Sequence, residues 1–128
     1  MEITTIKTER FEIVMGVVSG YFHNNEAEGD KSFGETLQQL QAEVMAETGL
    51  YVSAIWKPAM VSYSTDWGCP AGGEKVYQIT GTRNPAFAKD PEKYREAAEL
   101  LCTKLMEFFH QSTATMEWQK TELSYLQS

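Results

Sequence analysis

The order of two helical and four strand-like segments constrains the fold of this chain more than any other feature. One strand-like run precedes the first helix, two lie between the helices and one follows the second. This order is typical of the ferredoxin-like α+β sandwich, a βαββαβ fold with a four-stranded antiparallel sheet and two helices on one face. Because 128 residues is close to the commonest domain size, we expect one domain over residues 1–128.

Both helices carry clear start signals. Ser32 is followed three residues later by Glu35, which is a capping box, and Gly49 suits the end of the same helix. Asp90 is a good N-cap for the second helix, with Pro91 in its first position. The predicted helices cover residues 32–48 and 90–111.

Runs of β-branched and aromatic residues predict the strands. They cover residues 11–22, 51–64, 74–82 and 114–123, and the residues after 123 are expected to form a short tail. The first run is apolar on both faces, which favours a central position in the sheet. Pro58 interrupts the second run, and because proline cannot donate to a strand ladder, that strand should lie at an edge. Both positions agree with the usual ferredoxin-like strand order, 4-1-3-2.

Two helices can cover only one face of such a sheet. The strands nevertheless supply apolar residues to both faces, since Trp56 and Met60 alternate with Ile55 and Val61. We therefore expect the open face to be covered by a second copy of the chain, by another protein or by a ligand. A homodimer packed sheet to sheet is the simplest cover. The alternative is that one end of the chain folds over this face.

Composition and charge exclude several classes of protein. Eighteen acidic and 11 basic residues give a net charge of −7, which disfavours direct binding to nucleic acid or to an anionic membrane surface. The sequence has neither a bilayer-spanning apolar stretch nor a secretory signal, so a cytoplasmic location is expected. Cys69 and Cys102 are then expected to be free thiols, the first exposed and the second buried. No motif calls for a cofactor.

The predicted topology brings several polar side chains to one rim of the fold. They are His23, Asp66, Cys69 and His110. A histidine there could act as acid or base with Asp66 orienting it, and Cys69 could act as a nucleophile. The spacing does not match paired metal ligands, so no metal site is predicted. The simpler interpretation is that these are ordinary surface residues, since His110 suits a helix end.

Aromatic residues supply the candidate contacts for a ligand or partner. Trp67 lies in the turn-rich segment 65–74, and a large aromatic side chain in a small, polar loop often anchors an interface. Trp56, Tyr77 and Tyr21 are the other candidates, from the strands. Whether the chain is an enzyme is left open by these residues.

Three functional interpretations fit this sequence. The first is a non-catalytic binding or assembly module, homodimeric through the open face of its sheet. The second is a cofactor-free, isomerase-like enzyme acting on a small molecule, with a pocket at the sheet face or at the predicted rim. The third is an acidic inhibitor that occupies a basic surface of another protein.

Overall fold

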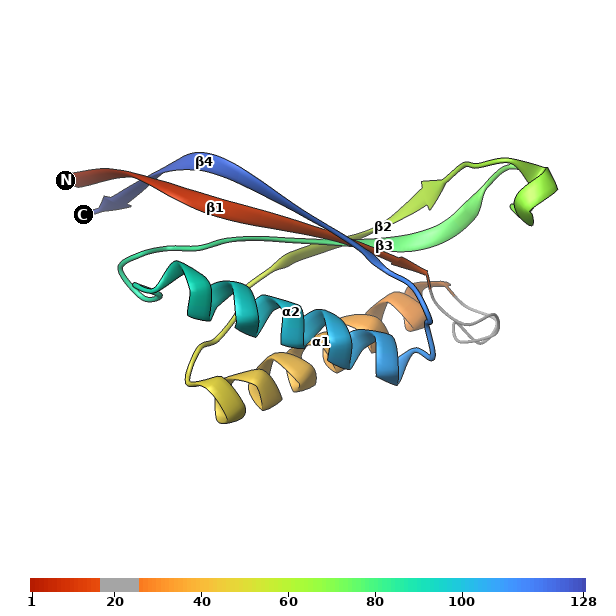
Figure 1. Ribbon diagram of the computed structural model, residues 1–128, viewed down its shortest axis with the longest axis horizontal. Helices are drawn as coiled ribbons and strands as arrows, with labels where there is room; N and C mark the ends of the chain where they lie inside the picture. Colours follow the sequence, from red (N-terminus) through yellow and green to blue (C-terminus); the bar gives the residue numbers. More distant parts are fainter. Residues whose placement is uncertain (17–25) are drawn as a thin grey trace.

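A computed structural model describes residues 1–16 and 26–128, and it describes the side chains of the second stretch from residue 29. The elements are β1 (Glu2–Gly16), α1 (Glu26–Thr48), β2 (Ile55–Val61), the short 3-10 helix η1 (Thr65–Trp67), β3 (Glu74–Thr82), α2 (Pro91–Phe108) and β4 (Thr115–Gln127). The strands form one antiparallel sheet in the order β2-β3-β1-β4. Both helices lie on one face of this sheet (Figure 1). The ferredoxin-like α+β prediction is confirmed, with the expected order of strands.

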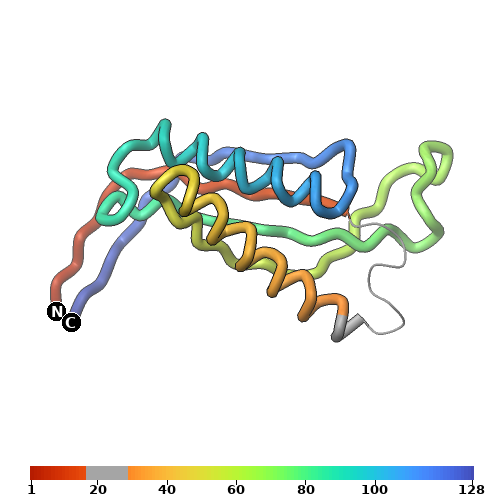
Figure 2. Tube along the Cα trace, turned by 90° about the horizontal axis from the view of Figure 1, so that it is seen from below, coloured from red at the N-terminus to blue at the C-terminus, as the bar shows by residue number. Residues whose placement is uncertain are grey.

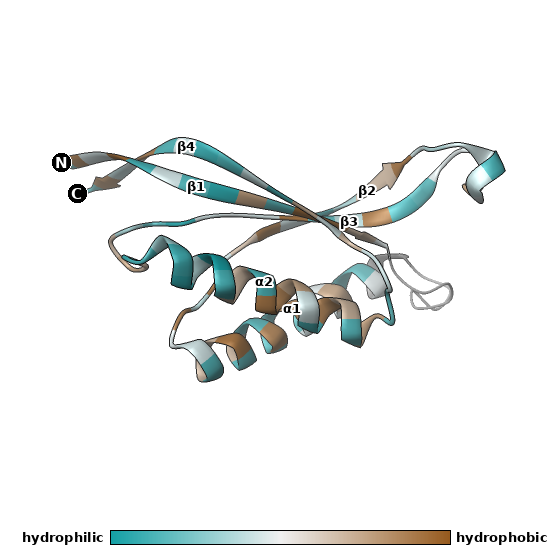
Figure 3. Ribbon diagram, viewed as in Figure 1, coloured by the Kyte–Doolittle hydropathy of each residue, from teal (hydrophilic) through white to brown (hydrophobic). Residues whose placement is uncertain are grey.

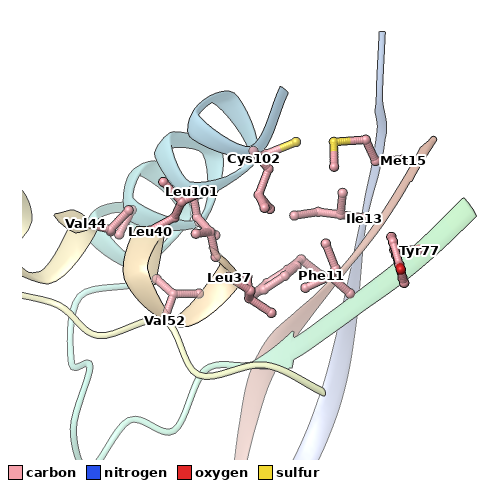
Figure 4. Close-up of a cluster of buried hydrophobic side chains, with 14 of the residues drawn as sticks. Phe11, Ile13, Met15, Leu37, Leu40, Val44, Val52, Tyr77, Leu101 and Cys102 are labelled. Atoms are coloured by element: carbon pink, nitrogen blue, oxygen red, sulfur yellow. The ribbon is translucent and has the colours of Figure 1, made fainter. Parts of the chain in front are cut away.

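The core lies between the helices and the sheet. Alternate residues of β1 point into it, and one stripe of each helix faces them (Figure 4). Residues in this layer include Phe11, Ile13, Met15, Leu37, Leu40, Val44, Tyr77, Leu101 and Cys102. Burying one such large apolar side chain contributes about 1.5–3 kcal/mol, so this layer is the main source of stability. Cys102 is buried, as its position in the helix predicted.

The open face of the sheet is more polar at its centre than the sequence predicted. Because Phe11, Ile13 and Met15 are buried under the helices, the residues that alternate with them, Arg10, Glu12 and Val14, point to the opposite face. There the Gln78 side chain donates to Glu12 across 3.2 Å. Val14 is apolar as expected, but its partners on the two neighbouring strands are the polar Gln78 and Thr115, so this face is mixed. Residues 17–22 of the predicted first strand lie outside the described residues.

The helix ends follow the predicted signals at two of four places, the start of α2 and the end of α1. Asp90 caps α2, its carboxylate accepting from the N–H groups of Glu92 and Lys93. α1 ends just before Gly49, which has a left-handed φ of 81°. α2 ends at Phe108, three residues before the predicted end. The predicted start at Ser32 is wrong, because α1 already runs from Glu26 and the capping-box residues lie inside it.

Strands β1 and β4 are longer than predicted at the ends of the chain. Glu2 pairs with Gln127, so the residues expected to form a tail are part of β4. The two termini consequently lie side by side, and this two-stranded ribbon extends beyond the helices (Figures 1 and 2). β2 is shorter than predicted, and Pro58 lies within it at the sheet edge, as expected.

Hydrophilic and hydrophobic residues alternate along both helices (Figure 3). Among the described helices, none combines the length and the apolar character that crossing a bilayer requires.

Candidate functional site

A tyrosine and a glutamate close the base of the loop between β2 and β3. The Tyr63 phenol donates a hydrogen bond of 2.8 Å to Oε2 of Glu74. The strand register pairs Val61 with Glu74, so the tyrosine extends just past the last strand pair. This hydrogen bond is the main reason that the pKa of Tyr63 is raised above 10.0, because it favours the neutral phenol. The Tyr63–Glu74 pair therefore consists of a neutral phenol that donates a hydrogen bond to a carboxylate.

The loop beyond this pair has a defined local geometry. Ser64 caps η1 by accepting from the N–H of Asp66, and Gly68 ends it at a φ of 99°. Gly73 has a φ of 107°, and a Cβ there would lie 2.9 Å from the carbonyl oxygen of Val61. Only glycine fits that close approach without strain. The backbone thus fixes where the tyrosine–glutamate pair sits.

Among the described residues, Glu74 takes part in none of the ion pairs, so none of their cations neutralises its charge. The next residue, Lys75, instead pairs with Asp30 of α1 at 3.0 Å. The same Asp30 oxygen accepts from the Tyr77 hydroxyl at 2.6 Å. Glu74 is therefore suited to attract a positively charged group of a ligand.

The predicted aromatic contacts occupy very different environments. Trp67 is 81% exposed on η1, at the tip of the β2–β3 hairpin. Trp56 is half-buried and packs edge-on against Phe33, with ring centres 5.2 Å apart. Tyr77 is fully buried and stacks on the same Phe33 ring at 3.8 Å. Tyr21 lies outside the described residues. Of the three predicted contacts that the structure describes, Trp67 has the most exposed side chain.

The predicted rim is only partly described. Asp66 and His110 are exposed, and His110 follows α2 with a φ of 54°. Cys69 is buried, at 6% exposure, which differs from the expected exposed thiol. Its loop closes on itself, with the Cys69 N–H donating to the carbonyl oxygen of Ser64 at 3.4 Å. No hydrogen bond or ion pair joins these three side chains in the described part of the chain, and the hairpin tip projects beyond α2 (Figure 1). His23 lies outside the described residues, and the shared site remains a prediction.

No set of histidine, cysteine and carboxylate side chains in the described residues could hold a metal ion.

The sequence analysis did not identify the Tyr63–Glu74 pair. The available signal was their position on either side of the turn-rich loop, but recognising the contact requires the register of β2 against β3.

Comparison with known proteins gives two kinds of match. The family model of SAM lyases matches residues 6–127. A phage SAM lyase in complex with S-methyl-5'-thioadenosine has a similar fold, with a TM-score of 0.59 and 15% identity over 92% of this chain and 88% of that one. The apo form of a phage SAM lyase gives the same TM-score and identity over 93% and 89%. A putative PII-like signaling protein from Thermus thermophilus follows, with a TM-score of 0.41 and 12% identity over 93% and 90%. No curated protein matches the chain.

The match across residues 6–127 corrects the functional interpretation of the sequence. The non-catalytic binding or assembly module is wrong, because the matching family is defined by an enzymatic activity. The interpretations as an isomerase-like enzyme and as an acidic inhibitor are wrong for the same reason, because the matching family is that of SAM lyases. The sequence held no motif that identifies this reaction, so composition and spacing alone could not reach it. With nearly its whole length matched, the chain belongs to the SAM lyase family.

Proposed function

We propose that this protein is a lyase that cleaves S-adenosylmethionine between its sulfur and its amino-acid chain. The observation that carries the proposal is the family match over residues 6–127. The phage SAM lyase with bound S-methyl-5'-thioadenosine supports it, because that molecule is what remains of S-adenosylmethionine after this bond breaks. The fold alone would not suffice, since ferredoxin-like proteins carry out many unrelated functions.

The chemistry of this cleavage sets what the site must provide. The sulfur keeps the electron pair of the broken carbon–sulfur bond, so a sulfonium cation becomes a neutral thioether. The amino-acid fragment balances this in one of two ways. Its carboxylate attacks the carbon and closes a lactone, or an adjacent C–H bond gives its proton to a base and its electrons to an alkene. Neither route consumes water, and both remove separated charges, so a site shielded from water favours them.

Glu74 is suited to bind the α-ammonium group of this substrate. A carboxylate beside the sulfonium would stabilise a charge that disappears in the reaction, and so it would favour the ground state over the transition state. Beside the ammonium group, the attraction is the same before and during bond breaking, so it binds and orients the amino-acid chain. The Tyr63 hydrogen bond holds the carboxylate in place. The exposed Trp67 indole offers a face for the adenine ring.

The test compares the wild-type protein with Glu74→Gln, using chromatography to follow formation of S-methyl-5'-thioadenosine from S-adenosylmethionine. We expect the wild type to exceed the rate in buffer alone, and the variant to raise KM about tenfold or more, because it loses one charge-assisted contact. The matched control is Glu35→Gln, an exposed α1 carboxylate 4.0 Å from Lys31, which should leave KM unchanged.

The two parts of this proposal fail separately. An inactive but folded wild-type protein contradicts the lyase function. An active wild type whose KM is unaffected by Glu74→Gln contradicts only the role given to that carboxylate.

We also propose that the chain works as a homo-oligomer, with a homodimer through the open sheet face as its simplest form. Ile55, on that face, is 75% exposed, and Trp67 is 81% exposed near the tyrosine–glutamate pair. A second copy would cover such apolar surface and shield the site from water. Light scattering coupled to size-exclusion chromatography should give a molar mass that is a multiple of the 14.5 kDa of one chain. A single-chain mass at high protein concentration contradicts this assembly.

A further inference from the structure

A pocket lies at the opposite end of β3 from the tyrosine–glutamate pair. Its volume is about 360 Å³, within the usual size range of small-molecule sites. The walls come from the end of α1, the segment leading to β2 and the loop between β3 and α2. The lining residues are Met45, Gly49, Leu50, Tyr51, Ser53, Thr82, Asn84, Phe87, Ala88 and Tyr94. Since Glu74 begins β3 and Thr82 ends it, roughly 25 Å of strand separates the two sites.

Tyr94 lines this pocket, and its hydroxyl has no hydrogen-bond partner in the described part of the chain. The side chain is only 4% exposed, and its oxygen is buried. Burial raises the pKa of Tyr94 to about 12, so the hydroxyl keeps its proton at neutral pH. Buried polar groups in native proteins are nearly always paired, and an unpaired one calls for an explanation. This hydroxyl is a donor that lacks an acceptor.

The rest of the lining is uncharged. Its aromatic rings include Phe87, which is 74% exposed, and Tyr51. Asn84 accepts from the N–H of Ala86 through its side-chain oxygen, so its amide N–H groups are its remaining donors. The nearby guanidinium of Arg83 is engaged by Glu9 and by the carbonyl of Ala88. Such a lining suits a flat, neutral molecule with acceptor atoms and disfavours an ion.

We propose that this pocket binds an uncharged heteroaromatic molecule whose ring acceptor receives a hydrogen bond from the Tyr94 hydroxyl. Because the Tyr94 hydroxyl oxygen is buried, binding in this way requires the β3–α2 loop to shift slightly and admit the acceptor. The bound molecule then accepts a hydrogen bond from the Tyr94 hydroxyl. Because this hydroxyl has already lost its contact with water, the new hydrogen bond contributes more to the binding free energy than one to an exposed donor. The inference is independent of the lyase function, because the pocket shares no residue with the tyrosine–glutamate pair.

The test uses isoquinoline, which is neutral at pH 7.5 and has a ring-nitrogen acceptor, and indole, which has a similar shape but no such acceptor. Amide chemical shifts are followed during titration of the wild-type protein. We expect isoquinoline to shift residues 49–53 and 84–88 and to bind at least fivefold more tightly than indole. Tyr94→Phe should reduce isoquinoline binding at least fivefold, while raising the melting temperature because the unpaired hydroxyl is gone.

The matched control is Tyr51→Phe, which removes a second hydroxyl from the same pocket. That hydroxyl donates to Gln41 at 3.2 Å, so its loss should not weaken isoquinoline binding. Equal binding of isoquinoline and indole, unchanged by Tyr94→Phe, overturns the proposal and leaves only a non-specific apolar pocket. The absence of any shift in the two segments overturns it as well. Both outcomes are judged from binding alone, so they do not depend on whether the protein has lyase activity.

Discussion

The phenol of Tyr63 and the carboxylate of Glu74 join the two ends of the β2–β3 loop across 2.8 Å. Removing the donor with Tyr63→Phe should leave the fold intact and let the carboxylate rotate. Because the carboxylate then loses a charge-assisted hydrogen bond that holds it in place, we expect kcat/KM for S-adenosylmethionine to fall roughly 5- to 30-fold. Steady-state kinetics measures the fall, and Tyr51→Phe, at the other end of the molecule, is the control.

The same pair predicts how activity changes at alkaline pH. The raised pKa of Tyr63 means that the neutral phenol and its hydrogen bond persist past pH 10.0 and are lost as the pH rises through the folded-state value. The activity of the wild type should therefore fall as the pH rises through the pKa of Tyr63. Tyr63→Phe should lack the corresponding inflection, and an identical profile in both proteins contradicts the role of the phenol.

Gly73 and Gly72 are adjacent glycines that differ in their surroundings. Both have positive φ, 107° and 90°, but only at Gly73 would a Cβ meet a backbone oxygen, at 2.9 Å. Gly72→Ala should cost about 1 kcal/mol for its backbone conformation, and Gly73→Ala should cost clearly more, about 2–4 kcal/mol. Urea unfolding of the two variants gives the difference, and equal costs contradict the close packing of this loop.

An ion pair between Glu9 and Arg83 links β1 to the end of β3, with Nε and Oε2 2.6 Å apart. The hydrogen bond from Arg83 lowers the pKa of Glu9 below 4.5. This contribution to stability is therefore present above pH 4.5 and is lost as the pH falls through the folded-state pKa.

Replacing this carboxylate should accordingly matter at neutral pH and not in acid. Because Arg83 is buried but Glu9 is 31% exposed, we expect Glu9→Gln to lower the free energy of unfolding by about 1–3 kcal/mol at pH 7. The difference from wild type should shrink towards zero as the pH falls through the folded-state pKa of Glu9. The exposed Arg95–Glu99 pair provides the control, since Glu99→Gln should have little effect at either pH. A constant difference at both pH values contradicts the account.

Phe11 lies over Gly81, its partner on the neighbouring strand. A Cβ at Gly81 would come within 2.6 Å of the Phe11 ring and 2.7 Å of the carbonyl oxygen of Ser53. Gly81→Ala should therefore destabilise the fold by about 1–3 kcal/mol through overpacking. Thr80→Ala, at the adjacent and half-buried position, is the comparison by thermal unfolding. A Gly81→Ala protein as stable as the wild type would contradict this prediction, because it would show that the strands can move apart here without loss of stability.

Local signals predicted the elements that local chemistry controls. Asp90 with Pro91, Gly49 and Pro58 each act through their own backbone, and each lies where the sequence placed it. The start of α1 escaped prediction because distant contacts decide it. Asp30 binds Lys75 and Tyr77 of β3, and a helix that begins before Ser32 brings it there.

The candidate site depended on information that is not local in the sequence. Tyr63 meets Glu74 only through the pairing of β2 with β3, and no spacing rule singles out these two residues. The reaction itself was beyond composition and motifs, because an acidic ferredoxin-like domain is compatible with many functions. The family match over residues 6–127 supplied it.

The most direct measurement mixes the purified wild-type protein with S-adenosylmethionine and quantifies all adenosine-containing products by mass spectrometry. We predict that S-methyl-5'-thioadenosine forms in a one-to-one ratio with the substrate lost, at a rate proportional to protein concentration and well above that in buffer. A folded protein that leaves the substrate at the buffer rate, or that produces S-adenosylhomocysteine instead, would contradict the account.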